Sequence, residues 1–250
     1  MEKKVPVKLR KEPLIEAIWE VRFKSGKFSA VDLLPGLIFK ALPDKYPNTV
    51  RLPTSFIPDP VAHVDPKLRY KPKVRLERKH QAVQIGEQMV SLSCRRPYPG
   101  WEIFSEDIQT LIKVIRETKL IDKLERFSLK YINIIDLEHP PGVGCLDFEL
   151  KIGEYELDSR PIQFRIEIEE GKENLVHTLQ IASPAEATLP GEPRIRGVLL
   201  DIDTIRPMKQ DESWDDIDSH LNKVHSALIR MFFGLLKPET IEHLEPIYKG

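Results

Sequence analysis

Short segments in which apolar and polar residues alternate dominate this chain, and few segments repeat apolar residues at helical spacing. An alternation with a period of two is typical of a β-strand that buries one of its faces. The clearest case places Ala17, Trp19, Val21 and Phe23 on one face of a strand. Because the alternating runs are joined by turn-length polar pieces, they predict antiparallel sheet rather than repeated βαβ units.

Further strands are predicted by the same alternation. They cover residues 74–76, 83–85, 90–92, 127–137, 146–152, 163–169, 175–181 and 197–205. The three runs between 73 and 93 are predicted to form a meander. The runs 163–169 and 175–181 are predicted to form a hairpin around 170–174.

Three segments have helical spacing, and each follows a serine that is suited to cap a helix: Ser29, Ser105 and Ser213. Pro35 lies inside the first segment, so this helix is expected to start late or to kink. The predicted fold class is therefore α+β, with a curved, mainly antiparallel sheet packed by about three helices. Closure of the sheet into a barrel is left open.

Five prolines interrupt the segment between 53 and 72, namely Pro53, Pro58, Pro60, Pro66 and Pro72. A regular central strand is not expected where proline is so dense, because proline cannot donate a hydrogen bond to the ladder. The segment is predicted to be either an ordered Ω-type excursion or a mobile flap.

The 250 residues suit one α+β domain over 1–250, with two lobes meeting near 120–126 as the alternative. The net charge of -1 gives no overall field that favours nucleic acid or an anionic membrane. No apolar stretch has the length of a signal-peptide core or a membrane span, so a cytoplasmic location is expected. Cys94 and Cys145 form neither a CxxC motif nor a disulfide framework.

Paired carboxylates on two predicted strands are the most chemically suggestive feature. Glu167 and Glu169 share one face of their strand with Arg165, and Asp201 and Asp203 share one face of another. On a solvated sheet these residues would form cross-strand ion pairs that contribute about 0.2–1 kcal/mol each. On a cupped or closed sheet they would line a ligand site.

The ligand-site interpretation assigns the carboxylates to Mg²⁺ or Mn²⁺ and the arginines Arg22, Arg75 and Arg165 to phosphate or another anion. Such a wall resembles the triphosphate-tunnel enzymes, whose barrels carry alternating acidic and basic residues. The Glu-x-Glu-x-Lys signature of that group is absent, since Glu16 and Glu20 have a different spacing.

Trp101 follows Tyr98-Pro-Gly and precedes a predicted helix. It is predicted either to offer an aromatic contact to a ligand or to anchor this loop to the core. His220 and His225 are five residues apart on the last helix, which is not the spacing of a helical zinc site. The basic region 69–79 contains Glu77, so a solvated strand and loop is as plausible there as a polyanion site.

Three motifs carry a resemblance that spans most of the chain: Pro13-Leu-Ile-Glu16, Tyr98-Pro-Gly-Trp101 and Lys130-Tyr131-Ile-Asn133. Their order and spacing resemble those of a sporadically distributed prokaryotic family of uncharacterised cytoplasmic proteins of about this length. The resemblance implies a free-standing protein and supplies no catalytic residues. By analogy it points to an accessory or defence-type gene module with a protein partner encoded nearby.

The chain has no Gly-x-x-x-x-Gly-Lys-Ser/Thr loop, no Gly-x-Gly-x-x-Gly fingerprint and no Gly-x-Ser-x-Gly elbow. The sequence therefore predicts a non-catalytic binding or regulatory protein that engages a partner protein or a small anionic ligand. The alternative is a phosphohydrolase or nucleotide-processing enzyme that depends on Mg²⁺ or Mn²⁺. Catalytic residues are not assigned, nucleic acid is not favoured, and a homodimer is left open.

Overall fold

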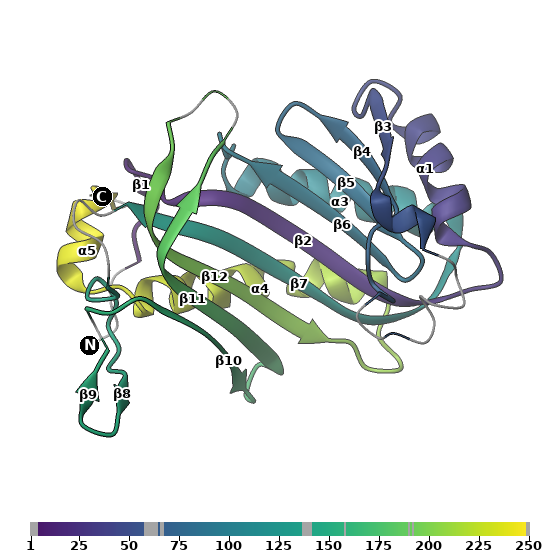
Figure 1. Ribbon diagram of the computed structural model, residues 1–250. Coiled ribbons are helices and arrows are strands. Elements are labelled where there is room, and N and C mark those ends of the chain that lie inside the picture. Colours follow the sequence, from purple (N-terminus) through teal and green to yellow (C-terminus); the bar gives the residue numbers. More distant parts are fainter. Residues whose placement is uncertain are drawn as a thin grey trace. The chain divides into compact units, whose positions relative to one another are not determined.

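The computed structural model describes residues 5–57, 65, 68–136, 142–157, 159–189, 191 and 193–248. Its helices and strands follow the order shown in Figure 1. The helical elements are α1 (Ala30–Ala41), the 3₁₀ helix η1 (Pro53–Phe56), α3 (Trp101–Thr118), α4 (Trp214–Gly234) and α5 (Pro238–His243). The strands are β1 (Lys8–Leu9), β2 (Leu14–Ser25), β3 (Asn48–Arg51), β4 (Val74–Arg78), β5 (Gln81–Gly86), β6 (Met89–Arg95), β7 (Ile121–Asp136), β8 (Lys151–Ile152), β9 (Tyr155–Glu156), β10 (Ile162–Glu170), β11 (Leu175–Ala187), β12 (Ile195–Pro207) and β13 (Pro246–Ile247).

Nine strands form one antiparallel sheet in the order β10-β11-β12-β7-β2-β6-β5-β4-β3. The predicted α+β class with a mainly antiparallel sheet is confirmed, and the sheet is not closed into a barrel. Two smaller antiparallel sheets pair β1 with β13 and β8 with β9. No helix within the described residues is long and apolar enough to cross a membrane.

The chain divides into two compact units, each built from several segments. The first unit comprises residues 1–15, 130–204 and 223–250. The second unit comprises residues 16–129 and 205–222. Strand β7 contributes to both units, because its residues up to 129 belong to the second unit and those from 130 onward to the first. Neither unit is therefore a single continuous stretch of sequence.

The second unit is built on the meander β4-β5-β6 with β2 on one side and β3 on the other. The apolar face of β2 is the predicted one, since Ala17, Trp19, Val21 and Phe23 are all buried. Helices α1 and α3 lie on this same face (Figure 1). Asp107 of α3 accepts hydrogen bonds from Arg78 of β4 and Gln81 of β5. The opposite face of these strands therefore carries the polar residues that alternate with the buried ones.

The first unit joins the hairpin β10-β11 to parts of β12 and β7. Asn133 of β7 is buried and donates a hydrogen bond to the carbonyl of Leu200 on β12 at 3.1 Å. A Cβ at Gly197 would lie 1.9 Å from the carbonyl oxygen of Ile135, so only glycine permits the approach of these backbones. His225 of α4 packs beside the ring of Tyr131, with ring centroids 6.0 Å apart.

Two helix starts differ from the sequence prediction. Helix α3 begins at Trp101 with Gly100 as its N-cap, and the hydroxyl of Ser105 instead bonds back to the carbonyl of Glu102 inside the helix. Gly100 has a φ of 97°, a conformation that glycine adopts without strain. The N-cap is therefore five residues earlier than Ser105 indicates. Helix α1 begins directly after Ser29 and continues through Pro35, so the late start is wrong.

Two strand predictions also need correction. Residues 146–152 do not form one continuous strand: Leu146 makes only an isolated bridge to Leu236, and just the last two residues, Lys151 and Ile152, form a strand, β8, which pairs with β9. Strand β7 begins at Ile121 rather than at 127, and residue 137 lies outside the described residues. In the proline-rich segment the described part holds η1, whereas residues 58–64, 66 and 67 are not described.

Candidate functional site

A row of polar residues crosses four strands of the second unit on the face opposite the helices. Direct pairing aligns Glu20 of β2 with Ser91 of β6, Ser91 with Gln84 of β5, and Gln84 with Arg75 of β4. Side chains at directly paired positions lie on the same face of a sheet. We call these four residues the charged row, because its two ends are ionic and its centre is a hydroxyl and an amide.

The carboxylate of Glu20 holds two guanidinium groups. Its Oε1 accepts a hydrogen bond from Arg22 Nε at 2.7 Å and another from Arg126 Nη2 at 3.0 Å. The side chains of Arg126 and Glu20 are 19% and 22% exposed, so this cluster is largely removed from water. Arg22 and Arg126, the arginine pair, therefore bring two positive charges onto a single carboxylate oxygen.

Arg126 is not fully satisfied by this contact. Its Nε is buried and has no hydrogen-bond partner among the described residues. A guanidinium presents its donors as a planar fork that matches two oxygens of a carboxylate or phosphate. Arg126 thus uses one donor on Glu20, while its buried Nε has the geometry to donate to a second oxygen.

Arg75 forms the other end of the charged row. Its Nε lies 2.8 Å from Oε2 of Glu77, which is two residues along the same strand. This ion pair is not a hydrogen bond, and the Nε of Arg75, like that of Arg126, is buried without a hydrogen-bond partner among the described residues. The side chains of Arg75 and Glu77 are about one-third exposed. Between the two ends, Ser91 is buried and Gln84 is partly buried, and both are neutral hydrogen-bonding groups.

The end of the proline-rich segment, at Tyr70 and Lys71, contacts this face. A Cβ on Gly86 would be only 2.6 Å from the carbonyl oxygen of Lys71, so the segment contacts the strand closely at this glycine. The guanidinium of Arg22 lies 4.3 Å from the ring centroid of Tyr70, and the Tyr70 hydroxyl donates to Glu125 at 2.8 Å. Burial and the bond to Glu125 raise the pKa of Tyr70, so it stays a neutral donor at the border of the row.

The charges at this face favour an anion. At the Glu20 end of the row, two guanidiniums, on Arg22 and Arg126, share a single carboxylate, whereas Arg75 at the other end is paired with Glu77. An excess positive charge in a partly buried place attracts anions more strongly than it would in open water, because the effective dielectric is lower. The face is therefore suited to bind an oxyanion through guanidinium forks.

The four carboxylates that the sequence predicts as metal ligands lie in the first unit, two on β10 and two on β12. Glu167 is exposed and forms an ion pair with Arg165 at 2.7 Å, and Glu169 is exposed as well. Asp201 is buried beside Lys130, with Nζ and Oδ2 2.8 Å apart, while Asp203 is partly buried. Strand β11 separates the strand of the glutamates from that of the aspartates. Over the described ranges, no group of three His, Cys, Asp or Glu residues is arranged to hold a metal ion.

Trp101 is the first residue of α3, and its indole Nε1 donates to Asn222 of α4 at 2.9 Å. Next to it, the rings of Tyr98 and Phe104 meet edge to face with centroids 5.8 Å apart. These contacts support the interpretation in which this loop is anchored, because the polar atom of the indole is already engaged.

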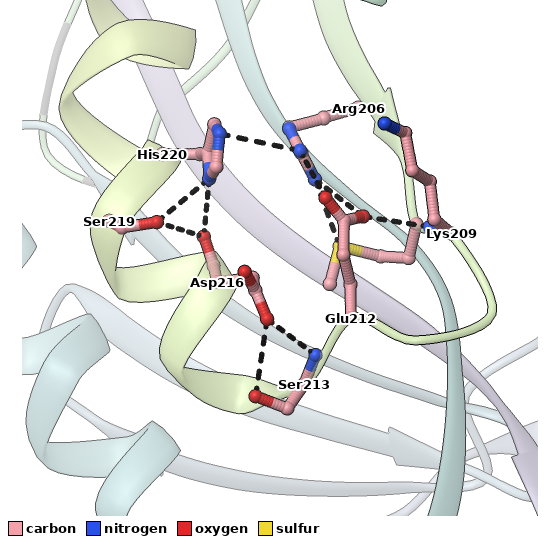
Figure 2. Close-up of polar contacts among 8 residues, drawn as sticks. Arg206, Lys209, Glu212, Ser213, Asp216, Ser219 and His220 are labelled. Carbon is pink, nitrogen blue, oxygen red and sulfur yellow. Dashed lines mark hydrogen bonds and ion pairs between the residues drawn. The ribbon is translucent and has the colours of Figure 1, made fainter.

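The densest polar network joins the end of β12 to the start of α4, as Figure 2 shows. Arg206 donates to both carboxylate oxygens of Glu212, at 2.6 and 3.1 Å, and lies 3.4 Å from Nε2 of His220. This bond to Arg206 lowers the pKa of Glu212 to about 2. Because Arg206 is buried and bidentately paired, the network acts as a structural clamp.

A hydroxyl, an imidazole and a carboxylate also line up in the first unit. His177 lies 3.0 Å from the Thr204 hydroxyl and 3.1 Å from a carboxylate oxygen of Glu170. The order matches a catalytic triad, but Thr204 is 0% exposed and cannot meet a substrate. Thr204 and Glu170 therefore provide hydrogen-bond partners for the buried ring of His177.

The thiols do not have the environment of reactive cysteines. Cys94 and Cys145 are both buried, and burial raises the pKa of each to about 11. A neutral thiol is a poor nucleophile, since the thiolate is the reactive form.

Sequence reasoning placed Arg22, Arg75 and Glu20 on a polar face but missed Arg126, Ser91 and Gln84. Arg126 was missed because the strand was predicted to begin one residue later, at 127. Extending the alternation of β7 backwards from the buried Phe127 would have put Arg126 on the polar face. Arg126 can share the carboxylate of Glu20 with Arg22 because β7 is a neighbour of β2 in the sheet. The order of strands in a sheet cannot be read from the alternation.

Neither a protein-family model nor a curated protein matches the sequence of this chain.

Proposed function

We propose that this protein is a non-catalytic binding protein that takes a small anionic ligand on the polar face of its second unit. The observation that carries the proposal is the convergence of Arg22 and Arg126 on one oxygen of Glu20. Two partly buried guanidiniums on one carboxylate leave an excess positive charge that an anion neutralises. Ser91 and Gln84, which are neutral hydrogen-bond donors, occupy the next two positions of the row after Glu20.

A binding role fits the chemistry of these groups better than catalysis does. The charged row has hydrogen-bond donors and cations but neither a histidine nor a cysteine that would move a proton or attack a substrate. Its one carboxylate, on Glu20, already accepts hydrogen bonds from Arg22 and Arg126, and Glu77 beside the row is ion-paired with Arg75.

Isothermal titration with inorganic pyrophosphate in a phosphate-free buffer tests this function. The parent chain is expected to bind, and the Arg22→Gln, Arg126→Gln double variant is expected to lose at least tenfold in affinity, since charge-assisted hydrogen bonds contribute about 1.5–3 kcal/mol each. Unchanged affinity in the double variant would refute the proposal, as would a parent chain that does not bind.

Arg165→Gln is the matched control. Arg165 forms the same kind of ion pair as Arg22, with a glutamate two residues away on its own strand at 2.7 Å. It lies in the first unit and is 57% exposed, so its replacement is expected to leave pyrophosphate binding unchanged. Any general effect of removing an arginine would appear in both variants.

The metal-dependent alternative is tested with the same samples. Mg²⁺ or Mn²⁺ is added with pyrophosphate, and release of orthophosphate is followed. We expect no turnover. Turnover that disappears in Glu167→Ala would establish the enzymatic alternative in place of the proposed function.

A further inference from the structure

Guanidinium groups lie at both ends of the charged row: Arg22 and Arg126 on the carboxylate of Glu20 at one end, and Arg75 at the other. Arg22 is fixed over β2 by Glu20, and Arg75 is fixed over β4 by Glu77. Each of these carboxylates is two residues from its arginine on the same strand, so neither guanidinium is drawn toward the other end. Strands β6 and β5 lie between them. With about 4.8 Å between neighbouring strands, the two ends are roughly 14 Å apart at the backbone.

Only neutral groups occupy the interval between the ends. Ser91 and Gln84 continue the row itself, and the neighbouring row across the same two strands contributes Ser93 and Ala82. No carboxylate stands at these four positions to repel an anion. The row itself is carboxylate, hydroxyl, amide, guanidinium. With Arg22 and Arg126 on its carboxylate, both ends present guanidinium groups that suit the two ends of an elongated anion.

The arginine pair favours a phosphoryl end over a carboxylate end. Glu20 contributes one oxygen to both guanidiniums, and the buried Nε of Arg126 has no partner among the described residues. A terminal phosphoryl group offers three oxygens, so it can occupy the position of the Glu20 carboxylate and also accept from this Nε.

We infer that the ligand is a linear polyphosphate chain that spans the charged row, with a terminal phosphoryl group on Arg22 and Arg126 and the far end of the chain on Arg75. This inference rests on the proposed function and specifies its ligand class. An inorganic polyphosphate and the phosphate chain of a nucleotide share this chemistry.

The test compares orthophosphate, pyrophosphate and tripolyphosphate by isothermal titration at one ionic strength. In the parent chain, affinity is expected to rise with chain length, with tripolyphosphate at least tenfold tighter than orthophosphate, because only the longer chain reaches Arg75. In Arg75→Gln, the gain with chain length is expected to disappear, so that tripolyphosphate binds no more tightly than orthophosphate does.

Arg75→Lys keeps the positive charge but lacks the two-pronged guanidinium group. This variant is expected to keep part of the gain in affinity with chain length. Arg165→Gln is again the control, and the thermal midpoint of each variant shows whether it folds. Titration with ATP separates the two sources: affinity equal to that of tripolyphosphate indicates an inorganic chain, whereas tighter binding indicates a nucleotide.

The outcomes separate the two proposals. If the parent binds all three phosphates equally and Arg75→Gln has no effect, the polyphosphate inference is overturned while anion binding at the arginine pair stands. If the parent binds none of them, the proposed function itself fails.

Discussion

At the scale of single residues, Glu20 decides how the anion face behaves without ligand. Its carboxylate neutralises part of the charge of Arg22 and Arg126 and occupies the place that an incoming oxyanion needs. Glu20 thus stabilises the free protein and competes with the ligand.

Glu20→Gln is therefore expected to increase the affinity for pyrophosphate, by roughly tenfold, because the amide keeps the shape but removes the competing charge. Isothermal titration measures the change. Glu167→Gln, which alters the equivalent pair with Arg165, serves as the control and is expected to change nothing. Weaker binding by Glu20→Gln would mean that this carboxylate supports the ligand rather than competes with it.

At the scale of elements, the clamp in Figure 2 fixes the turn between β12 and α4. Arg206 at the end of the strand pairs bidentately with Glu212 in the turn. The Ser213 hydroxyl accepts from the amide of Asp215, and Asp216 accepts from the amide of Ser213, which caps the helix in both directions. The sequence showed this cap through Ser213, but it did not show that Arg206 closes the turn.

Glu212→Gln is expected to lower the free energy of unfolding by about 2–3 kcal/mol at pH 7, since it leaves the buried Arg206 without its charged partner. The pKa of Glu212 is lowered from 4.5 to about 2. The stabilisation is therefore fully present above pH 4.5 and is lost as the pH falls through 2.

Urea denaturation at pH 7 and at several acidic pH values measures both effects. A double variant, Arg206→Met with Glu212→Leu, is expected to cost less than Glu212→Gln alone, because it leaves no unpaired buried charge. A single variant as stable as the parent would show that the clamp contributes nothing.

At the scale of the whole molecule, stability is expected to depend on pH through His225. Burial lowers the pKa of this histidine from 6.5 to about 4. Between these values the unfolded chain binds a proton that the folded chain does not, so stability falls as the pH drops from 6.5 to 4. The loss is expected to be about 2–3 kcal/mol.

Unfolding at pH 7 and at pH 5 isolates this effect, because the contribution of Glu212 changes only at lower pH. His225→Phe keeps a ring beside Tyr131 and is expected to flatten the pH dependence in this window. An unchanged slope in His225→Phe would assign the pH dependence to other groups.

The alternation in the sequence was enough to predict most of the sheet, because burying one face constrains every second residue. It predicted the buried face of β2, the meander β4-β5-β6 and the hairpin β10-β11. It failed over most of 146–152, where Leu146 makes only an isolated bridge and pairing with a strand is limited to residues 151 and 152. It also misplaced the start of α3, because a glycine with a positive φ replaced the expected serine cap.

The candidate site was only partly predictable for a related reason. Alternation shows which residues share a face of one strand, as it did for Arg22 with Glu20 and for Arg75 with Glu77. It does not show which strands are neighbours. The contact between Arg126 and Glu20 arises from residues 106 positions apart, and the charged row depends on the register of four strands.

The carboxylate of Glu20 is attached to the strand that carries Arg22, and this has a consequence for selectivity. A tethered group has an effective concentration at its own binding place in the millimolar range or above, and it never diffuses away. An ion that makes only one contact, such as chloride, would have to replace the hydrogen bonds of both Arg22 and Arg126 to displace it. We therefore expect the arginine pair to favour ions that make several contacts at once over simple anions such as chloride.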